Sequence, residues 1–346
     1  MKERRRRMMD FLEVVGNEDG CSQSRLGLCF LVYMMRLLGV PLLCVAVLQI
    51  AQVGSGLFLD EMMDARYWRC VYKRSFTCPN PDIRFYLYAK AGARRKAIDV
   101  RMSHTALLRS GFDPDKRSVI LLHGFNGTVD TEPLTFIKRA YLNRGDYNVV
   151  LVDWGDLTKF PCYLTALSNT KLVAQCAAQM YSYLNAHGAA RESLQCVGHS
   201  LGAHICGMMT NHLTKKQHRI IDDASHVQVI HTNAGFLGAE APMGHVDFCV
   251  NGGRQQPSCT KTFNPLRPLR NERCSHFQGT CFFATTVTQT ERYVGVPCAR
   301  QCPPRRSPIK RRPGKPIPMG EHTPLGARGT YCVTIKDDFN CPFFAT

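Results

Sequence analysis

Ser200 lies between two glycines in the stretch Gly198–Gly202, and this spacing is typical of an enzymatic nucleophile. Apolar residues precede the stretch, and the small and apolar residues of Ala203–Leu213 follow it, which predicts a strand, a tight turn and a helix. A serine hydroxyl attacks only when it is exposed beside a base, so the turn must be sharp. Glycine at positions 198 and 202 lets strand and helix cross closely. We therefore predict that Ser200 is a nucleophile at the apex of this turn.

A second loop, His123–Gly127, directly follows the short apolar run Ser118–Leu122. Attack of a serine on an ester or amide carbonyl forms a tetrahedral oxyanion, which needs two main-chain N–H donors aimed at it. One donor follows the nucleophile and the other comes from an earlier loop after a strand. The sequence therefore predicts an oxyanion hole made by Leu201 and Phe125.

The general base is predicted from chain order, because nucleophile, acid and histidine follow one another in this kind of site. His276 comes after Ser200 and stands two residues from Cys274, so a disulfide there would hold it firmly. His245 is the main alternative. We predict that His276 is the base.

The strands and helices that must position these residues are predicted to alternate along the chain. A mostly parallel sheet with helices on both faces is the expected arrangement, and the fold class is α/β. Loop and turn structure is expected for Gly244–Phe248 and Asn251–Gly253. The predicted strands are Asp82–Ala89, Ala97–Met102, Ser118–Leu122, Asn148–Trp154 and Val227–His231, and the predicted helices are Glu132–Asn143 and Leu172–His187.

The 346 residues carry a formal net charge of +17, much of it in two runs, Lys2–Arg7 and Arg300–Lys315. Nucleic-acid binding would place basic residues among aromatic ones on a shared face, and no such pattern is present, so we predict no nucleic-acid partner. Basic runs can contact anionic lipid head groups, although solvated tails are the simpler interpretation of the C-terminal run.

Residues 26–54 are predicted to be a signal peptide or an uncleaved signal-anchor, preceded by a basic extension over residues 1–25. The apolar stretch after Arg36 is short for a membrane span, but the two apolar stretches counted across Arg36 are long enough for one. We therefore expect a secreted protein, or one anchored by this segment with its catalytic domain in the lumen or outside the cell. Residues 55–346 are expected to form one domain.

The chain has seventeen cysteines, and the fourteen beyond the signal segment indicate disulfides in an oxidising compartment. No metal site is predicted, because the pair Cys298 and Cys302 has no second pair at ligand spacing, and no cofactor is predicted. Cys196 and Cys206 flank the serine turn and are expected to be buried free thiols. The plausible disulfides are Cys259–Cys274, Cys281 with Cys298 or Cys302, and Cys332–Cys341.

Taken together, these motifs resemble the pancreatic-lipase family, which includes secreted lipases and phospholipases A1. The resemblance implies an α/β-hydrolase fold, hydrolysis of lipid esters with Ser200 as nucleophile and His276 as base, and no C-terminal β-sandwich domain. It extends over about residues 80 to 345. The matching motifs are VILLHGFNG at 119–127, NVVLVDW at 148–154, VGHSLGAHICG at 197–207, DASHVQVIHTNAGFLG at 223–238, GHVDFCVNGGRQQPSC at 244–259, CSH at 274–276, MG at 319–320 and GTYCVTI at 329–335.

One departure concerns the catalytic acid. The family carries it in a segment resembling G-L-D-P-A, and no such segment is present between the serine turn and Asp223, which matches a later structural aspartate. Asp222 is the local substitute and is our predicted acid. The alternatives are an isoform that lacks the segment, and a lipase-fold binding protein with impaired catalysis.

The family's lid lies between the cysteines that match Cys259 and Cys274. Here it is short and basic, with Arg267 and Arg270 among its charges. We therefore expect a phospholipid or another interfacial ester as substrate, with peripheral contact to a membrane or lipid droplet. Short lids also occur in insect members without known phospholipase activity, so this substrate assignment has an open alternative.

Overall fold

The computed structural model describes residues 76–92, 94–190, 193–213, 226–259, 269–298, 302 and 313–336. Two compact units divide the chain, Met1–Trp68 and Arg69–Thr346, and every described residue belongs to the second. The predicted extension, the signal segment and Asp222 lie outside the described residues. Within those residues, no helix has the length and apolarity needed to cross a bilayer.

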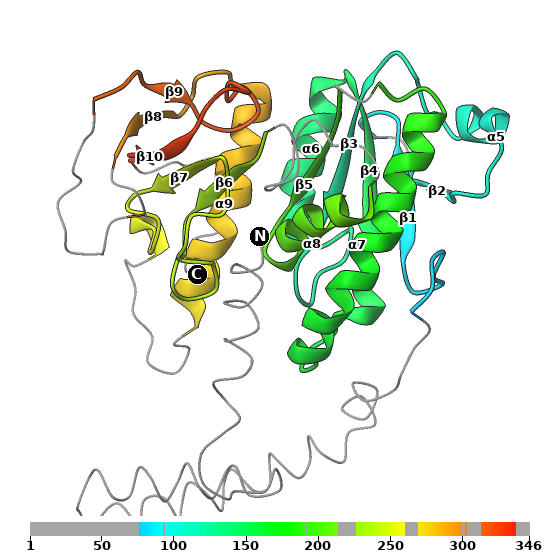
Figure 1. The fold of residues 1–346 in the computed structure, drawn as a ribbon, viewed down its shortest axis with the longest axis horizontal. Coiled ribbons are helices and arrows are strands. Elements are labelled where there is room, and N and C mark those ends of the chain that lie inside the picture. Colours follow the sequence, from blue (N-terminus) through cyan, green and yellow to red (C-terminus); the bar gives the residue numbers. More distant parts are fainter. Residues whose placement is uncertain are drawn as a thin grey trace, which may run out of the picture. The chain divides into compact units, whose positions relative to one another are not determined.

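The first sheet has five strands in the order β2-β1-β4-β3-β5 (Figure 1). Strand β3 pairs in parallel with both β4 and β5, whereas β1 pairs antiparallel with β4 and β2. Strand β5 therefore ends the sheet at one edge. The bounds are Arg84–Tyr88 for β1, Lys96–Ile98 for β2, Arg117–Leu122 for β3, Tyr147–Asp153 for β4 and Leu194–Gly198 for β5.

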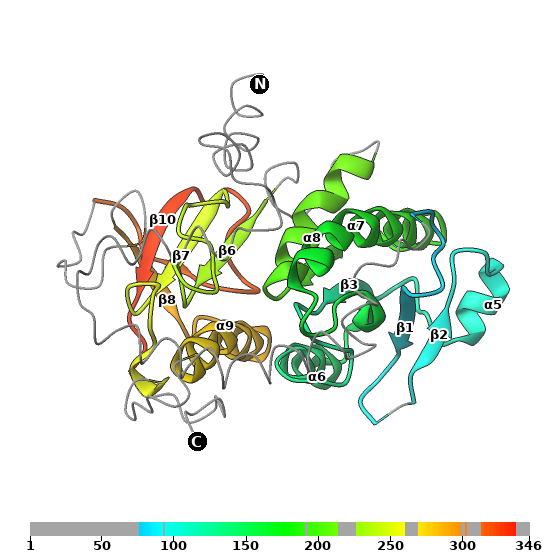
Figure 2. The ribbon, with the colours of Figure 1, turned by 90° about the horizontal axis from the view of Figure 1, so that it is seen from below.

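Helices cover both faces of this sheet, as predicted. Ile120 and Leu122 of β3 pack into one core with side chains of α7 and α8, while Val119 and Leu121 face a second core that includes α6. Figure 2 shows α7 and α8 on one side of β3 and α6 on the other. Burial on both faces explains the continuous apolar run of β3. The helices are α5 (His104–Arg109), α6 (Leu134–Arg144), α7 (Tyr163–Ala186) and α8 (Leu201–Met209).

The second sheet has the order β6-β7-β10-β8-β9. Strand β7 pairs in parallel with β6 and β10, and β8 pairs antiparallel with β10 and β9. Cys281 and Phe282 of α9 pack on this sheet. The bounds are Gln228–His231 for β6, Val246–Val250 for β7, Val294–Pro297 for β8, Ile317–Pro318 for β9, Gly329–Val333 for β10 and Arg270–Thr288 for α9. Three short 3₁₀ turns, Gly155–Leu157, Thr210–His212 and Pro257–Cys259, complete the described elements.

Two sequence expectations about these elements are corrected. Residues Val246–Phe248, predicted to be loop, belong to the fully buried strand β7, which extends to Val250. Asp247 lies in this strand with its side chain buried, and its carboxylate contacts His231 Nε2 at 2.7 Å. Helix α7 begins at Tyr163 and not at Leu172, and its first turns expose the apolar side chains of Leu164 and Leu167.

The disulfides confirm one predicted pair and correct the others. Cys259–Cys274 is formed as expected. Cys196 and Cys206, expected to be free thiols, are bonded to each other, because the turn brings their Cα atoms to 5.8 Å, within the range of a disulfide. Cys78 is bonded to Cys176.

The remaining corrections follow from the second sheet. Strands β7 and β10 place Cys249 opposite Cys332, and the disulfides formed there are Cys249–Cys302 and Cys298–Cys332. The predicted pairs of Cys281 with Cys298 or Cys302, and of Cys332 with Cys341, are therefore wrong. The sulfur atoms of Cys249, Cys298 and Cys332 lie within 4.8 Å of one another, but their disulfides remove them as metal ligands.

Candidate active site

Ser200 lies between β5 and α8, directly before the helix, in a strained main-chain conformation, with φ 56° and ψ −124°. A positive φ is rare for a residue other than glycine and costs free energy, so the surrounding structure must enforce it. Ser200 remains partly exposed at this apex. The predicted strand, sharp turn and helix are therefore present, with the serine where a nucleophile elbow places it.

The two flanking glycines allow this turn because their neighbours leave no room for a side chain. A Cβ atom on Gly198 would lie 2.2 Å from the carbonyl carbon of Gly202. A Cβ atom on Gly202 would lie 2.3 Å from the main-chain oxygen of Leu122, at the end of β3. Strand β5, helix α8 and strand β3 thus meet at contacts that only glycine permits.

The loop after β3 lies directly against Ser200. A Cβ atom on Gly124 would be 2.7 Å from Ser200 Cβ and 3.4 Å from its Oγ. Phe125 follows Gly124, and Leu201 is the first residue of α8, where main-chain N–H groups have no partner within the helix. The main-chain N–H of Asn126 donates to Thr158 O at 2.8 Å and fixes the far side of the loop. The two predicted oxyanion donors thus belong to segments in contact with each other.

His123 anchors this loop, a role that the sequence did not reveal. Trp154 donates its main-chain N–H to His123 Nε2 at 3.2 Å and its indole N–H to His123 O at 3.0 Å. The two rings stack with centroids 5.3 Å apart. Both residues are buried. The ends of β3 and β4 are therefore locked together beneath the loop.

His276 lies in α9, in the second turn of the helix and two residues after the disulfide-bonded Cys274. Its Nε2 atom is buried, and among the described residues it has no hydrogen-bond partner. Its main-chain oxygen contacts His199 Nε2 at 3.3 Å, and the two imidazole centroids are 4.6 Å apart. Burial lowers the pKa of His276 to about 4, and burial together with His276 lowers the pKa of His199 well below its usual value.

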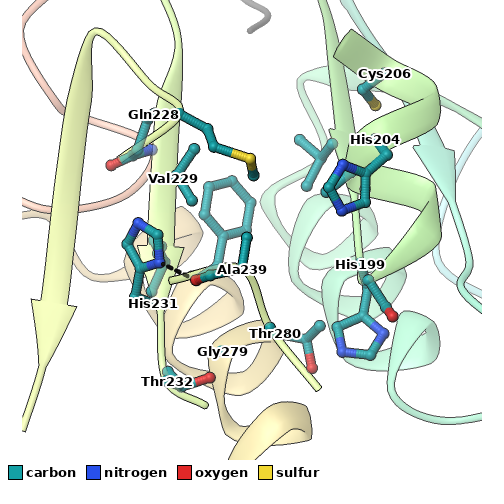
Figure 3. Close-up of a pocket in the computed structure, with 18 of the residues that line it drawn as sticks. His199, His204, Cys206, Gln228, Val229, His231, Thr232, Ala239, Gly279 and Thr280 are labelled. Atoms are coloured by element: carbon teal, nitrogen blue, oxygen red, sulfur yellow. Dashed lines mark hydrogen bonds between the residues drawn. The ribbon is translucent and has the colours of Figure 1, made fainter. Parts of the chain in front are cut away.

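One cavity of about 240 Å³ is lined by Ser200, Leu201 and His276. His245, the alternative base, is not among the residues that line it. Five histidines share the lining, namely His199, His204, His226, His231 and His276. Figure 3 shows His199 and His204 on one side of the cavity and His231 on the other. The structure therefore brings the predicted nucleophile and the predicted base to the same cavity.

No carboxylate in the described part of the chain forms an ion pair with His276. The histidine–carboxylate pairs found there are His123–Asp153, at 3.6 Å, and His231–Asp247, at 2.7 Å. Asp247 also accepts hydrogen bonds from the main-chain N–H groups of Met243 and Gly244, so its role is to hold β6 and β7 together.

Glu321 is a buried carboxylate that also lines the cavity, but it is too far from His276 to be its acid. Its main-chain N–H donates to Thr286, ten residues along α9 from His276. At 1.5 Å per residue this corresponds to about 15 Å. Its carboxylate oxygens instead accept hydrogen bonds from Tyr141 at 2.6 Å and Tyr147 at 2.5 Å. The predicted acid Asp222 lies outside the described residues.

Comparison with known families gives a match to the model described as Lipase, over residues 60–222 and 221–302. The match is in two stretches that overlap at residues 221 and 222, next to the place where the segment expected to carry the acid is missing from the sequence. Together with the strand–turn–helix at Ser200, this match confirms the predicted α/β-hydrolase fold.

Curated relatives include Lipase member H-A of Xenopus laevis, 29% identical over 205 residues that cover 53% of this chain and 44% of that protein. Phospholipase A1 VesT1.02 of Vespa tropica is 29% identical over 217 residues, 53% of this chain and 70% of that protein. The chain thus spans less than half the length of Lipase member H-A. A phospholipase/carboxylesterase from Dyadobacter fermentans has 14% identity and a TM-score of 0.24, covering 39% of this chain and 65% of that one.

Proposed function

The chain belongs to the lipase family, and we propose that it is a serine hydrolase of lipid esters. The observation that carries this proposal is the shared cavity of Ser200 and His276, with the nucleophile held at a strained elbow. Strain of this kind is retained where it has a use, and here it presents a hydroxyl to the cavity that His276 also lines, with an imidazole Nε2 that has no hydrogen-bond partner among the described residues.

The reaction follows from these positions. Ser200 Oγ attacks the ester carbonyl carbon while His276 Nε2 takes the hydroxyl proton. The oxyanion that forms accepts hydrogen bonds from the main-chain N–H groups of Phe125 and Leu201. His276 then gives its proton to the leaving alcohol, and an acyl-serine remains. Water, deprotonated by His276, attacks that acyl group and releases the fatty acid and the free serine.

Asp222 is the proposed acid of this mechanism. Burial favours the neutral imidazole, which can accept a proton but holds it weakly once charged. A carboxylate beside His276 would stabilise the imidazolium that forms at each proton transfer. Removing the acid costs about ten-thousandfold in kcat in the worked serine-protease case, so the proposed activity depends strongly on this contact.

A lipid substrate is supported by the names of the relatives and by the surface beside the cavity. Tyr163 and Leu237 line the cavity and are both about half exposed. The segments that carry them expose further large apolar side chains, namely Phe160, Leu164, Leu167 and Phe236. Exposed apolar groups at the mouth of a cavity suit insertion into a lipid surface. We propose peripheral contact with a membrane or lipid droplet through these residues.

Phospholipid is the proposed substrate class within the lipid esters. The Vespa tropica relative is named a phospholipase A1. The lid that Cys259 and Cys274 close contains Arg267 and Arg270, which would attract an anionic surface. Changing both arginines to serine should reduce hydrolysis of anionic phosphatidylglycerol vesicles relative to neutral phosphatidylcholine vesicles. Equal hydrolysis of both by the variant and by wild type would contradict this assignment.

Secretion is proposed as the location. Disulfides persist in oxidising compartments, and five are present in the described part of the chain. Residues 26–54 would supply the signal or the anchor.

The second candidate function is lipid binding on a lipase scaffold with impaired catalysis. It is favoured by one observation, the absence of an ion pair between His276 and any described carboxylate. A binding protein needs the cavity but not an activated serine, so reactivity of Ser200 separates the two candidates.

The test uses secreted protein, comparing wild type with Ser200→Ala and with Ser193→Ala, a matched serine upstream of the elbow. We expect wild type and Ser193→Ala to react with a fluorophosphonate and to release fatty acid from phosphatidylcholine vesicles. Ser200→Ala should do neither. Folded wild type that does not label, yet retains fatty acid in a binding assay, would overturn the hydrolase in favour of the binding protein.

A further inference from the structure

We propose that Asn126 carries an N-linked glycan, and that this glycan limits how deeply the neighbouring apolar surface enters a lipid layer. Asn126, Gly127 and Thr128 form the pattern N-x-S/T, the acceptor of N-glycosylation in secreted proteins. The full sequence contains this pattern nowhere else. The inference rests on the secretion and the lipid contact proposed above, because the glycan is added in the secretory pathway.

Asn126 is exposed on the loop after β3, as a glycosylated residue must be in the folded protein. Its main-chain N–H donates to Thr158 O at 2.8 Å, and its side-chain Oδ1 accepts a hydrogen bond from the main-chain N–H of Phe160 at 3.2 Å. The folded loop thus uses the oxygen of the side-chain amide, whereas a glycan is attached to its nitrogen, Nδ2. A glycan on Nδ2 is therefore compatible with these hydrogen bonds.

The turn alone does not account for the whole triplet. Asn126 has a φ of 55°, a conformation that asparagine adopts more readily than most residues. Asn251 has nearly the same φ, 50°, and is also followed by a glycine. Gly253 stands there in the place that Thr128 takes in the first triplet. A turn of this kind thus forms without a hydroxyl two residues after the asparagine, and Asn251 is a built-in comparison that should stay unmodified.

A glycan on Asn126 leaves the active-site cavity open. The described residues that line this cavity include Ser200 and Leu201 but not Asn126. Gly124 lies against Ser200 at the elbow, whereas Asn126 is bonded to Thr158 on the far side of the loop. The glycosylated side chain therefore lies outside the space in which the ester is expected to react.

The same side chain lies beside the exposed apolar groups that we propose to enter lipid. Phe160, whose N–H is bonded to Asn126 Oδ1, is 65% exposed. The ring of Phe125 meets that of Tyr163 edge-on, with centroids 5.1 Å apart, and Tyr163 is 48% exposed. Sugar hydroxyls lose hydrogen bonds to water when they enter an apolar layer, which costs free energy. A glycan on Asn126 therefore opposes insertion of Phe160 and Tyr163.

The modification needs one co-reactant, a lipid-linked oligosaccharide, which the transferase of the secretory pathway supplies. Asn126 Nδ2 forms a bond to C1 of the first sugar and loses a proton. The lipid diphosphate leaves with the electron pair of the broken C–O bond. The hydroxyl of Thr128 completes the pattern that the transferase requires.

Mass spectrometry of the full chain, expressed in eukaryotic cells with Ser200→Ala throughout, tests the attachment. We expect a glycan-removing amidase to lower the mass of this protein and to leave aspartate at position 126, with Asn251 unchanged. Asn126→Asp keeps the acceptor oxygen and Thr128→Ala keeps the asparagine, and the mass of neither variant should change. Thr128→Ser retains both the pattern and the hydroxyl that accepts the Asp130 N–H at 3.3 Å, so it should carry the glycan.

Co-sedimentation with phosphatidylcholine vesicles tests the effect on lipid contact. We expect the Asn126→Asp and Thr128→Ala proteins to bind vesicles several-fold more strongly than the glycosylated Thr128→Ser protein. The two unglycosylated variants differ in charge, so equal binding by both excludes a charge effect. Phe160→Ser added to Thr128→Ala should remove most of the gain, because it removes the apolar group beside the glycosylation site. If Asn126→Asp does not fold, Thr128→Ala and Thr128→Ser still decide the inference.

Three outcomes would overturn it. Disulfide-bonded protein whose mass the amidase does not change would do so while leaving the proposed secretion intact. Equal vesicle binding by glycosylated and unglycosylated proteins would show that the glycan does not limit lipid contact. Protein with free thiols and no glycan would overturn the proposed secretion together with the inference. None of these results depends on the Ser200 hydroxyl, so the proposed hydrolase activity is judged separately by fluorophosphonate labelling.

Discussion

Gly124 is packed so tightly against Ser200 that a single added methyl group would meet the nucleophile: its Cβ would lie 2.7 Å from Ser200 Cβ and 2.9 Å from the main-chain oxygen of His199. The loop that carries the proposed oxyanion donor Phe125 is therefore placed by contact with the elbow that carries the serine. Alignment of hydroxyl and donor depends on this missing side chain.

The first prediction concerns Gly124→Ala. The added methyl must push the loop away from Ser200, which moves the Phe125 N–H from its position. Losing one oxyanion donor costs about 100- to 1,000-fold in kcat, and we expect a loss of that size in ester hydrolysis. Gly326→Ala is the matched control, because nothing lies within 4 Å of its added Cβ. Equal kcat values for the two variants would contradict the proposed dependence of catalysis on the close contact between Gly124 and Ser200.

The elbow could be predicted from the sequence because its constraints are local. Gly198 and Gly202 are needed by contacts within a few residues and by the end of the neighbouring strand, so their spacing carries the geometry. Strands β3 and β4 could also be predicted from the sequence, since burial on both faces leaves an unbroken apolar run.

The features that were missed depend on contacts between distant segments. Strand β7 contains Asp247, whose burial becomes understandable only once His231 of β6 lies beside it. The disulfides Cys249–Cys302 and Cys298–Cys332 depend on the register of β7 and β10, which no local pattern shows. His123 could have been suspected from its position after an apolar strand, but its partner Trp154 comes from another strand end.

The second prediction concerns Glu321, which connects the segment after β9 to the first sheet. Its buried carboxylate accepts hydrogen bonds from Tyr141, Tyr147 and Gln195. Glu321→Ala removes the buried acceptor that these donors share, and we expect the free energy of unfolding to fall by about 3 kcal/mol, with a smaller fall for Glu321→Gln. Urea denaturation measures the free energy of unfolding of both variants.

The control for Glu321 is Glu240→Ala, which removes an exposed ion pair with Arg254. Exposed ion pairs contribute about 0–1 kcal/mol, so this variant should unfold at nearly the wild-type urea concentration. A Glu321→Ala protein that is as stable as Glu240→Ala would show that the buried hydrogen bonds contribute little.

The third prediction concerns the pH dependence of stability through His199. Burial, with a contribution from His276, holds its pKa in the folded state well below 6.5. The unfolded chain therefore binds a proton first as pH falls, and the folded state loses stability progressively below about pH 6.5. We expect His199→Gln to lose less stability than wild type between pH 7 and pH 5 in thermal unfolding. His212→Gln, at an exposed position, is the control and should lose as much stability as wild type over this pH range. If the stability of His199→Gln also fell in parallel with that of wild type, burial of the His199 ring would be contradicted.

The fourth prediction concerns the proposed acid, through the pH dependence of hydrolysis. Burial alone sets the pKa of His276 at about 4, and a neighbouring carboxylate raises it by favouring the imidazolium. If Asp222 is that carboxylate, kcat/KM of wild type falls with decreasing pH at a value above 4. Asp222→Asn should move this fall down toward pH 4 and lower kcat by about ten-thousandfold, because no carboxylate then stabilises the buried imidazolium.

Asp223→Asn, one residue along, is the matched control and should keep the wild-type pH profile. Identical profiles for Asp222→Asn and wild type would remove Asp222 from the mechanism, while leaving Ser200 and His276 to be judged by fluorophosphonate labelling.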